Sequence, residues 1–464
     1  MESGHITPHQ MEGVKLFFSQ ISPLEIAFYA APFCLLLASL AFLPLFFHRF
    51  WESNRNKAII SLVLGLPSAL FFIARDWHVL AHTALDYAAF VSLMGALFII
   101  SGGIYIRGAF AGLPWVNALF MLIGALLANF IGTTGASMLL IRPLLRANHT
   151  RVNKAHIVVF FIFIVSNCSG LLTPLGDPPL FLGFLKGVSF GWTLQLWPQW
   201  LFVNCTLLLL FFAIDEFWFK REHHDTRAIL KKNDGLLSER FGIEGKRNFL
   251  LLLLVITLIL ISGYWIYPLE GEPVFGESFG GFASKLFQII GMILLASLSF
   301  FFTPKKIHQK NHFSFHPIIE VAVLFAGIFL AMIPALLILE TQGAKLHLEE
   351  TWQLFWMTGL LSGFLDNAPT YLTFTSLAKG TLGLTGEGLG ELMHHARGQE
   401  LLKAISCGAV FMGAMTYIGN GPNFMVKAIA EHSKVKMPGF FGFMLWSGFI
   451  LIPVFSLVTL FFFR

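Results

Sequence analysis

The sequence predicts an all-α polytopic membrane protein, and three observations lead to that fold class. Hydrophobic residues make up 56% of the 464-residue chain and charged residues only 12%, whereas a soluble protein carries about 25% charged residues. The mean hydropathy is +0.72. Apolar segments long enough to cross a bilayer as helices recur along the whole chain. These features exclude a water-soluble enzyme and a disordered chain, and the lipid bilayer is the expected environment.

Eight segments are predicted to cross the membrane as simple helices, because each offers about 20 mostly apolar residues. They are 24–47, 57–74, 86–106, 193–214, 249–267, 284–302, 317–339 and 440–463. Two further apolar regions, 156–184 and 401–430, are interrupted by clusters of Gly and Pro. Each of them is predicted to be one broken crossing, which gives ten crossings in total.

Two apolar stretches remain, and each carries helix-breaking residues near its middle. Residues 116–145 are interrupted by Gly-Thr-Thr-Gly at 132–135, and residues 351–377 by Asp-Asn-Ala-Pro at 366–369. Each arm has about 13 residues, or roughly 20 Å as a helix, which is too short for a hydrocarbon core of about 30 Å. We therefore expect two re-entrant hairpins, each of which enters and leaves on one side of the membrane.

The distribution of basic residues predicts the orientation. If the polar segment 215–247, read as a surface helix or linker, is cytoplasmic, 22 of the 31 Lys and Arg residues lie on its side, as the positive-inside rule requires. Both termini are then outside. The net charge of +5 reflects these loops and indicates no nucleic-acid partner. Residues 1–23 form a polar segment without signal-peptide features, which suits a bacterial inner membrane.

An internal repeat relates the two halves of the chain. The broken regions read GLLTPLGDPPLF from residue 170 and GAMTYIGNGPNF from residue 413, an offset of 243. The hairpins match at an offset of 234, with FIGTT at 130–134 against FLDNA at 364–368. Residues 24–214 and 248–464 are thus predicted to be two repeats of five crossings. An odd number inverts the second repeat, as in secondary transporters whose sites lie near the midplane between broken helices.

The breaks supply oxygen ligands, because an interrupted helix leaves backbone groups without intrahelical partners in lipid. Hard cations prefer such oxygens, although half-helix amino ends also stabilise anions. The candidate ion- or substrate-binding residues are Asn129, Thr133, Thr134, Asn167, Thr173, Gly176, Asp177, Asp366, Asn367, Thr370, Thr416, Gly419, Asn420 and Asn423. Sodium is expected at two sets of these residues, namely Thr133, Thr134 and Asp177, and Asp366, Asn367 and Asn420.

Three carboxylates are candidates for proton coupling. Asp177 and Asp366 lie at the breaks, at membrane depth, where a carboxylate by default indicates a functional role; the alternative is helix capping. Glu320 lies near the inner start of its span, where it could simply face water. Because one carboxylate can hold either a proton or a sodium ion, a single site is sufficient for antiport.

Other motifs narrow the function further. Arg142 and Arg146 follow the first hairpin and are expected to anchor the inner surface; alternatively, Arg142 reaches an anionic substrate. The sequence has no Walker A motif and no evident pair of nucleophile and base. We therefore expect neither ATP-driven transport nor an enzyme, and no cofactor other than sodium ions.

Three motifs resemble a known group of transporters. SNCSGLLTPLGDPP at 166–179, LDNAPTY at 365–371 and YIGNGPN at 417–423 look like the NhaD-type sodium/proton antiporters and the similar citrate transporter family, both in the ion transporter superfamily. The resemblance implies a homodimer, an elevator-like motion of a transport part against a scaffold part, and sodium near each hairpin tip. The dicarboxylate branch carries Ser-Asn-Thr at its tips, whereas this chain has Gly-Thr-Thr and Asp-Asn-Ala.

The leading hypothesis is a secondary transporter that exchanges sodium for protons by alternating access. A sodium- or proton-coupled carrier of citrate or a similar carboxylate is the alternative, since a bound cation could offset the repulsion between the acidic breaks and an anion. A channel is a third hypothesis. Matched breaks that can occlude a site favour alternating access over an open pore.

Overall fold

A computed structural model of the chain describes residues 9–51, 53–108, 110–222, 242–274, 278–311, 313–384 and 388–464. The elements up to residue 222 are α1 (His9–Gln20), α2 (Pro23–Phe46), α3 (His48–Trp51), α4 (Asn54–Arg75), α5 (Trp77–Gly102), β1 (Tyr105–Arg107), α6 (Pro114–Ala147), α7 (Ala155–Ile164), η1 (Cys168–Leu171), α8 (Pro178–Leu185), η2 (Phe190–Leu196) and α9 (Trp197–Lys220). The later elements are β2 (Gly242–Glu244), α11 (Arg247–Ile261), η3 (Ser262–Ile266), α12 (Phe279–Phe302), α13 (Lys305–Lys310), α14 (His316–Gln342), η4 (Gly343–Leu346), α15 (Thr351–Phe364), α16 (Asn367–Thr381), α17 (Gly390–His394), α18 (Ala396–Met412), η5 (Gly413–Met415), α19 (Gly421–His432) and α20 (Phe440–Phe462).

The predicted class, an all-α polytopic membrane protein, is confirmed. Nine helices of the described residues are long and apolar enough to cross a membrane. Eight of them correspond to the eight simple crossings predicted above, and the ninth is α6, which contains the first predicted hairpin. Large apolar side chains such as Phe28 and Phe449 are 73% and 81% exposed, as expected for helices that face lipid.

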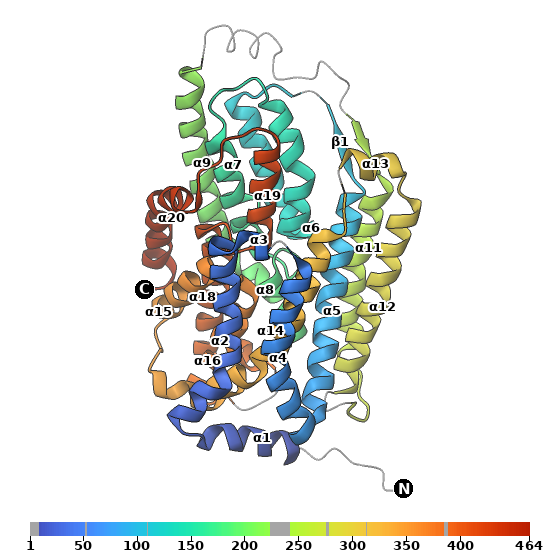
Figure 1. Cartoon of the computed structure of the whole chain (residues 1–464), viewed down its shortest axis with the longest axis vertical. Helices are drawn as coiled ribbons and strands as arrows, with labels where there is room; N and C mark the ends of the chain where they lie inside the picture. The colour runs from blue at the N-terminus through green and yellow to red at the C-terminus, as the bar shows by residue number, and fades with distance from the viewer. Residues whose placement is uncertain are drawn as a thin grey trace.

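The predicted bounds of the third crossing, 86–106, are wrong. Helix α5 begins nine residues earlier at Trp77, because Asp76 caps it and accepts a hydrogen bond from the His78 backbone at 3.1 Å. It ends at Gly102, and Ile106 instead pairs with Ile243 in the antiparallel β1–β2 ribbon. Figure 1 shows this ribbon next to α13 at one end of the bundle. Most of the predicted linker, 223–241, lies outside the described residues.

The N-terminal segment contains a short helix that does not cross the membrane. With 12 residues, α1 is about 18 Å long, and Figure 1 shows it lying across one end of the bundle. Gln342 Nε2 donates to the Phe18 carbonyl at 2.8 Å, and Lys15 Nζ lies 3.5 Å from a carboxylate oxygen of Glu340. These contacts fix α1 to the end of α14.

Both predicted broken crossings consist of two short α-helices separated by a 3-10 turn, η1 or η5, and irregular backbone. Helix α7 has 10 residues and α8 has 8, while α18 has 17 and α19 has 12. Asp177 and Asn420 are the N-caps of α8 and α19, with matching extended conformations of φ −148°, ψ 147° and φ −152°, ψ 140°. A Pro follows in the first turn of each helix, where its missing N–H removes no hydrogen bond. The two breaks therefore share a local backbone geometry.

Helix α6 turns back on itself at Gly132, which has φ +75° and ψ 156°, a region that residues with a Cβ rarely adopt. The two arms are antiparallel, because Asn117 and Asn148 at the ends of α6 exchange two hydrogen bonds of 3.1 and 2.7 Å. The second hairpin is formed by α15 and α16, which pack against each other. Asp366 caps α16 by accepting from the Ala368 backbone at 3.0 Å.

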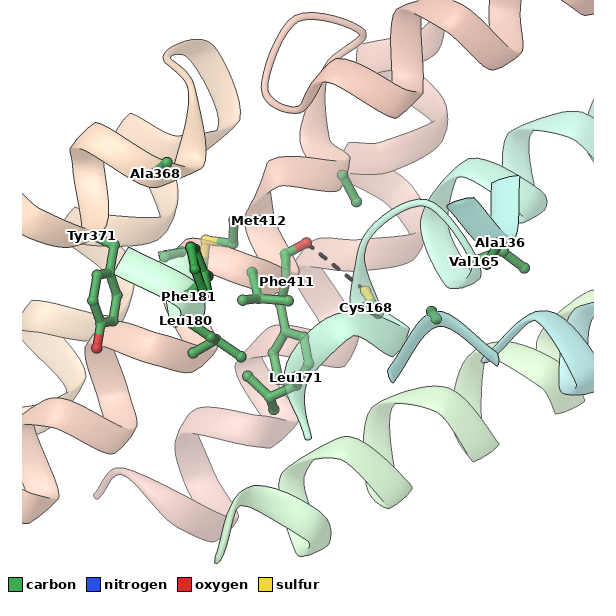
Figure 2. Close-up of a cluster of buried hydrophobic side chains, with 14 of the residues drawn as sticks. Ala136, Val165, Cys168, Leu171, Leu180, Phe181, Ala368, Tyr371, Phe411 and Met412 are labelled. Carbon is green, nitrogen blue, oxygen red and sulfur yellow. Dashed lines mark hydrogen bonds between the residues drawn. The ribbon is translucent and has the colours of Figure 1, made fainter. Parts of the chain in front are cut away.

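The short helices of each half pack on the hairpin of the other half. Helix α8 contacts α16, and α19 contacts α6. A Cβ on Gly183 would lie 2.5 Å from the Tyr371 hydroxyl, so α8 and α16 approach closely. Figure 2 shows the apolar cluster at this junction, where Cys168 Sγ lies 3.9 Å from the Phe411 carbonyl oxygen. The predicted repeat, with its offset of 243, makes these two residues equivalent. The two halves therefore interlock at the level of the breaks.

Candidate functional site

The carboxylate of Asp177 is the centre of the candidate site. Its side chain is buried, and the residue is only 2% exposed. Thr133 Oγ1 donates to Asp177 Oδ1 at 2.8 Å, Asn420 Nδ2 donates to the same oxygen at 3.1 Å, and Asn367 Nδ2 donates to Oδ2. Residues from both hairpins and from the second broken helix thus converge on one carboxylate of the first broken helix.

These contacts join positions that the predicted repeat makes equivalent. Thr133 and Asn367 are related by the hairpin offset of 234, and Asp177 and Asn420 by the offset of 243. The sequence predicted two separate ligand sets. In the structure, Thr133 from one set and Asn367 and Asn420 from the other bind the same carboxylate.

A chain of asparagine amides fixes the orientation of Asn420. Its Nδ2 also lies 3.2 Å from Asn167 Oδ1, and Asn167 Nδ2 donates to Asn423 Oδ1 at 2.7 Å. Asn423 Nδ2 in turn donates to the carbonyls of Gly413 and Thr416 at 2.8 and 2.9 Å. Since Asn167, Asn420 and Asn423 are all buried, these hydrogen bonds satisfy polar groups that would otherwise be costly to desolvate.

Further predicted residues bind each hairpin to its neighbouring break. Thr173 Oγ1 donates to the Asn129 carbonyl at 2.5 Å, and Thr416 Oγ1 donates to the Gly363 carbonyl at 2.5 Å. The Asn129 side chain also accepts from the Leu172 backbone at 3.0 Å. Both threonine contacts occur at equivalent positions of the predicted repeat, and both hold backbone together rather than pointing at Asp177.

Gly176 and Gly419 permit close backbone contacts at the two breaks. A Cβ on Gly176 would lie 2.3 Å from the Gly170 carbonyl oxygen, and one on Gly419 would lie 2.6 Å from the Gly413 oxygen. The Gly176 carbonyl also accepts from the Thr133 backbone at 2.8 Å. A larger residue at either position would clash with the backbone six residues earlier in the same broken region.

A pocket borders Asp177 on the side of α5. We call it the Asp177 pocket; its lining residues are Leu93, Met94, Leu97, Phe98, Ile131, Gly132, Thr133, Thr134, Gly135, Pro174, Leu175, Gly176, Asp177, Pro178 and Phe181. Thr134, the remaining predicted ligand of the first hairpin, thus lines it. The Asn367 amide donates to Asp177 through its Nδ2, and its Oδ1 is buried without a hydrogen-bond partner among the described residues. An oxygen in that position is suited to a cation.

Asp366, Thr370 and Glu320 do not contact Asp177 through any hydrogen bond of the described residues. Asp366 caps α16, and Thr370 Oγ1 donates to the Asp366 carbonyl at 2.9 Å. Glu320 lies 2.6 Å from Lys57 Nζ and is 33% exposed. The contact of Asp366 is thus that of a helix cap, which was the alternative to a functional role. Glu320 forms an ion pair with Lys57 at the surface of α14.

A buried ion cluster that was not predicted from the sequence surrounds Asp86 in α5. Lys186 Nζ, at the end of α8, lies 2.8 Å from Asp86 Oδ2, and Lys285 Nζ of α12 lies 2.5 Å from Oδ1. His82 Nδ1 is 3.5 Å from Oδ2. The sequence signal for this cluster is a carboxylate inside an apolar stretch, and the predicted bounds 86–106 hide it by placing Asp86 at the end of the span.

A second missed cluster centres on Asp215 in α9. Arg151 Nη1 and His156 Nε2 lie 2.6 and 2.8 Å from Asp215 Oδ1, and Asn117 Nδ2 donates to Oδ2 at 2.8 Å. All four residues are buried. They bind the ends of α6, α7 and α9 together on the linker side.

The donor set around Asp177 excludes a site of the zinc type. Across the described ranges, no three His, Cys, Asp or Glu side chains are grouped to hold a metal ion.

A family model described as "Putative citrate transport" matches residues 23–463. The chain belongs to this citrate transport family. No curated protein matches the chain. Together with the nine apolar helices found among the described residues, family membership makes the chain an integral membrane protein and a secondary transporter.

Proposed function

We propose that this member of the citrate transport family exchanges sodium ions for protons at Asp177. The observation that carries the proposal is a buried carboxylate whose hydrogen-bond donors, Thr133, Asn367 and Asn420, are all uncharged. Within the described residues, no ion pair involves Asp177. A buried carboxylate without a counter-charge is expensive, and either a proton or a cation relieves that cost.

The surrounding oxygens supply a plausible coordination shell for sodium. The Asp177 carboxylate accepts from the Thr133 hydroxyl and from the Asn367 amide, and Asn367 Oδ1 has no hydrogen-bond partner among the described residues. Hard cations prefer carboxylate, hydroxyl and amide oxygens of this kind. A proton on the carboxylate removes the charge that attracts the cation. Binding of the two ions is therefore mutually exclusive, and this competition couples an outward flow of one to an inward flow of the other.

The movement that exposes the site to both sides is part of the proposal. The resemblance described above supports an elevator-like motion of the hairpins and broken helices against a scaffold that includes α5 and α12, in a homodimer in the bacterial inner membrane. Lys186 at the end of α8 and Asp86 in α5 form an ion pair between these two parts. In this mechanism the pair breaks in each cycle, while Lys285 keeps the Asp86 charge paired.

The test is sodium-driven proton movement in vesicles that contain the purified chain and a pH-sensitive dye, without any carboxylate substrate. A sodium gradient should change the lumenal pH with the wild-type protein, and Asp177→Asn should abolish that change. Asp366→Asn is the matched control at the other break, because Asn retains an oxygen that can cap α16. We expect it to keep most of the exchange. Undiminished exchange in the Asp177 variant would refute the proposal.

Cation-coupled transport of a carboxylate is the second candidate function, and the family description favours it. A cation bound at Asp177 would offset the repulsion of an anionic substrate. The same vesicles distinguish the two candidates. Uptake of labelled citrate under a sodium gradient, with no pH response in its absence, supports the carrier; a pH response without citrate supports the antiporter.

A further inference from the structure

Asn420 is the counterpart of Asp177 in the predicted repeat, and it carries an amide where Asp177 carries a carboxylate. Both residues are N-caps of short helices, with nearly identical backbone conformations. Asp and Asn are common at N-caps because their side chains accept hydrogen bonds from the first helical N–H groups. Neither side chain makes such a bond here, whereas Asp366 does so at the start of α16. Capping therefore does not account for Asp177 or Asn420.

The amide nitrogen of Asn420 lies among three oxygen atoms. They are Asp177 Oδ1 at 3.1 Å, Asn167 Oδ1 at 3.2 Å and the Ser166 carbonyl oxygen at 3.3 Å. An amide nitrogen donates to such oxygens. A carboxylate oxygen in the same place would be repelled by them unless a proton or a cation lay between. The surroundings of position 420 thus suit an uncharged amide.

This amide limits the negative charge that faces a bound cation. The side chains that bind the Asp177 carboxylate are all neutral, namely Thr133, Asn367 and Asn420. One proton or one monovalent cation neutralises that carboxylate. A divalent cation would add a buried positive charge without a partner, which is costly. Asp366 offers no direct compensation, because its carboxylate caps α16.

We propose that Asn420 is the residue that restricts the site at Asp177 to monovalent cations. The inference rests on the proposed function for the presence of a cation there, and it adds the residue that sets the charge of that cation. Sodium displaces the proton of the Asp177 carboxyl group, and the proton leaves to water, so one positive charge replaces another. Sodium and calcium ions have nearly the same radius. The number of carboxylates, rather than the size of the site, therefore discriminates between them.

The two breaks should be interchangeable as the source of the charge. Thr133 and Asn367 occupy equivalent positions of the predicted repeat, and they donate to different oxygens of one carboxylate. If the carboxylate is moved from position 177 to position 420, an Asn remains at 177 as its donor. One negative charge then still lies between the same two hairpin tips. Asp177→Asn combined with Asn420→Asp should therefore recover the sodium binding that Asp177→Asn loses.

The experiment measures thermal unfolding of the purified full chain in detergent, from its tryptophan fluorescence. Sodium chloride or calcium chloride is titrated while choline chloride keeps the ionic strength constant. The wild-type chain should show a saturable rise in unfolding temperature with sodium and none with calcium. Asp177→Asn should weaken the apparent sodium affinity roughly tenfold to a hundredfold, as expected when an interaction with a charged group is lost.

The two variants of position 420 test the charge directly. Asn420→Asp should gain a saturable calcium response, because calcium favours sites with several carboxylate and carbonyl oxygens. The double variant should bind sodium within about tenfold of wild type, a difference of about 1.4 kcal/mol, and should not respond to calcium. Asp366→Asn is the matched control at the other break and should respond to both salts as the wild type does.

Three outcomes would overturn the role of Asn420. They are a calcium response in the wild-type chain, no calcium response in a folded Asn420→Asp chain, and no sodium response in a folded double variant. Size-exclusion chromatography establishes which variants are folded. If Asn420→Asp aggregates, the double variant, which keeps the wild-type charge, decides by its sodium response.

These measurements detect binding and need no transport. Sodium binding that depends on Asp177 without any sodium-driven pH change in vesicles would refute the antiport proposal and leave the role of Asn420 intact. A sodium-driven pH change together with no calcium response in Asn420→Asp would refute the role of Asn420 alone.

Discussion

Removal of the Asp86 carboxylate should destabilise the protein strongly. Asp86 is 2% exposed and the Lys285 side chain 4% exposed, and the two groups lie 2.5 Å apart. Asp86→Asn removes the carboxylate that pairs with the buried Lys285 ammonium, and loss of one partner of a buried ion pair typically costs about 3–5 kcal/mol. Lys186 adds little to this figure, because its side chain is 24% exposed and can reach water. We expect a loss of about 3 kcal/mol or more in the free energy of unfolding.

The assay is denaturant-induced unfolding in mixed micelles, followed by tryptophan fluorescence. Glu244→Gln is the control, because its partner Lys310 is 42% exposed and such surface pairs contribute less than about 1 kcal/mol. A double variant, Asp86→Leu with Lys285→Met, replaces the buried pair by apolar groups and should be more stable than Asp86→Leu alone. A double variant no more stable than the single one, or an Asp86→Asn loss no larger than the control's, would refute the reasoning.

Two further predictions concern backbone strain and pH. Gly132→Ala should destabilise the chain by about 1–3 kcal/mol, because position 132 has φ +75° and the new Cβ would lie 3.2 Å from the Leu175 carbonyl oxygen. Gly421→Ala is the control. Its new Cβ would meet nothing within 4 Å, so it should be nearly neutral in the same unfolding assay. Burial lowers the pKa of the His308 imidazole below its usual 6.5, so the unfolded chain binds a proton more readily and the folded chain loses stability as the pH falls below about 6.5. His308→Phe should reduce the difference in unfolding temperature between pH 7.5 and pH 5.5, and an unchanged difference would contradict this account.

The course of the simple crossings could be predicted from the sequence because lipid imposes one dominant requirement, a continuous apolar helix of sufficient length. The positions of the breaks could also be predicted, since Gly and Pro clusters are local signals. The bounds of α5 could not, because the cap at Asp76 and the pairing of Ile106 with Ile243 depend on side-chain geometry and on a segment far away in the chain.

Asp177 was predicted as a site residue because a carboxylate at a helix break is conspicuous. Its partners were predicted as candidates, but their grouping was not. The sequence placed Thr133 with Asp177 and Asn367 with Asp366, whereas the structure brings Asn367 to Asp177 and leaves Asp366 as a helix cap. Short sequence spacing favours pairs within one half, and only the interlocking of α8 with α16 reveals the pairs between halves.

The interlocked halves also have a consequence for biosynthesis. Asn367 follows its partner Asp177 by 190 residues and Asn420 follows it by 243. At about 5–20 residues per second, a ribosome needs on the order of 10–50 s to make these stretches. Throughout that interval the nascent first half carries a carboxylate at membrane depth without its amide partners. Water, the insertion machinery or a proton must shield it until translation of the second half delivers them.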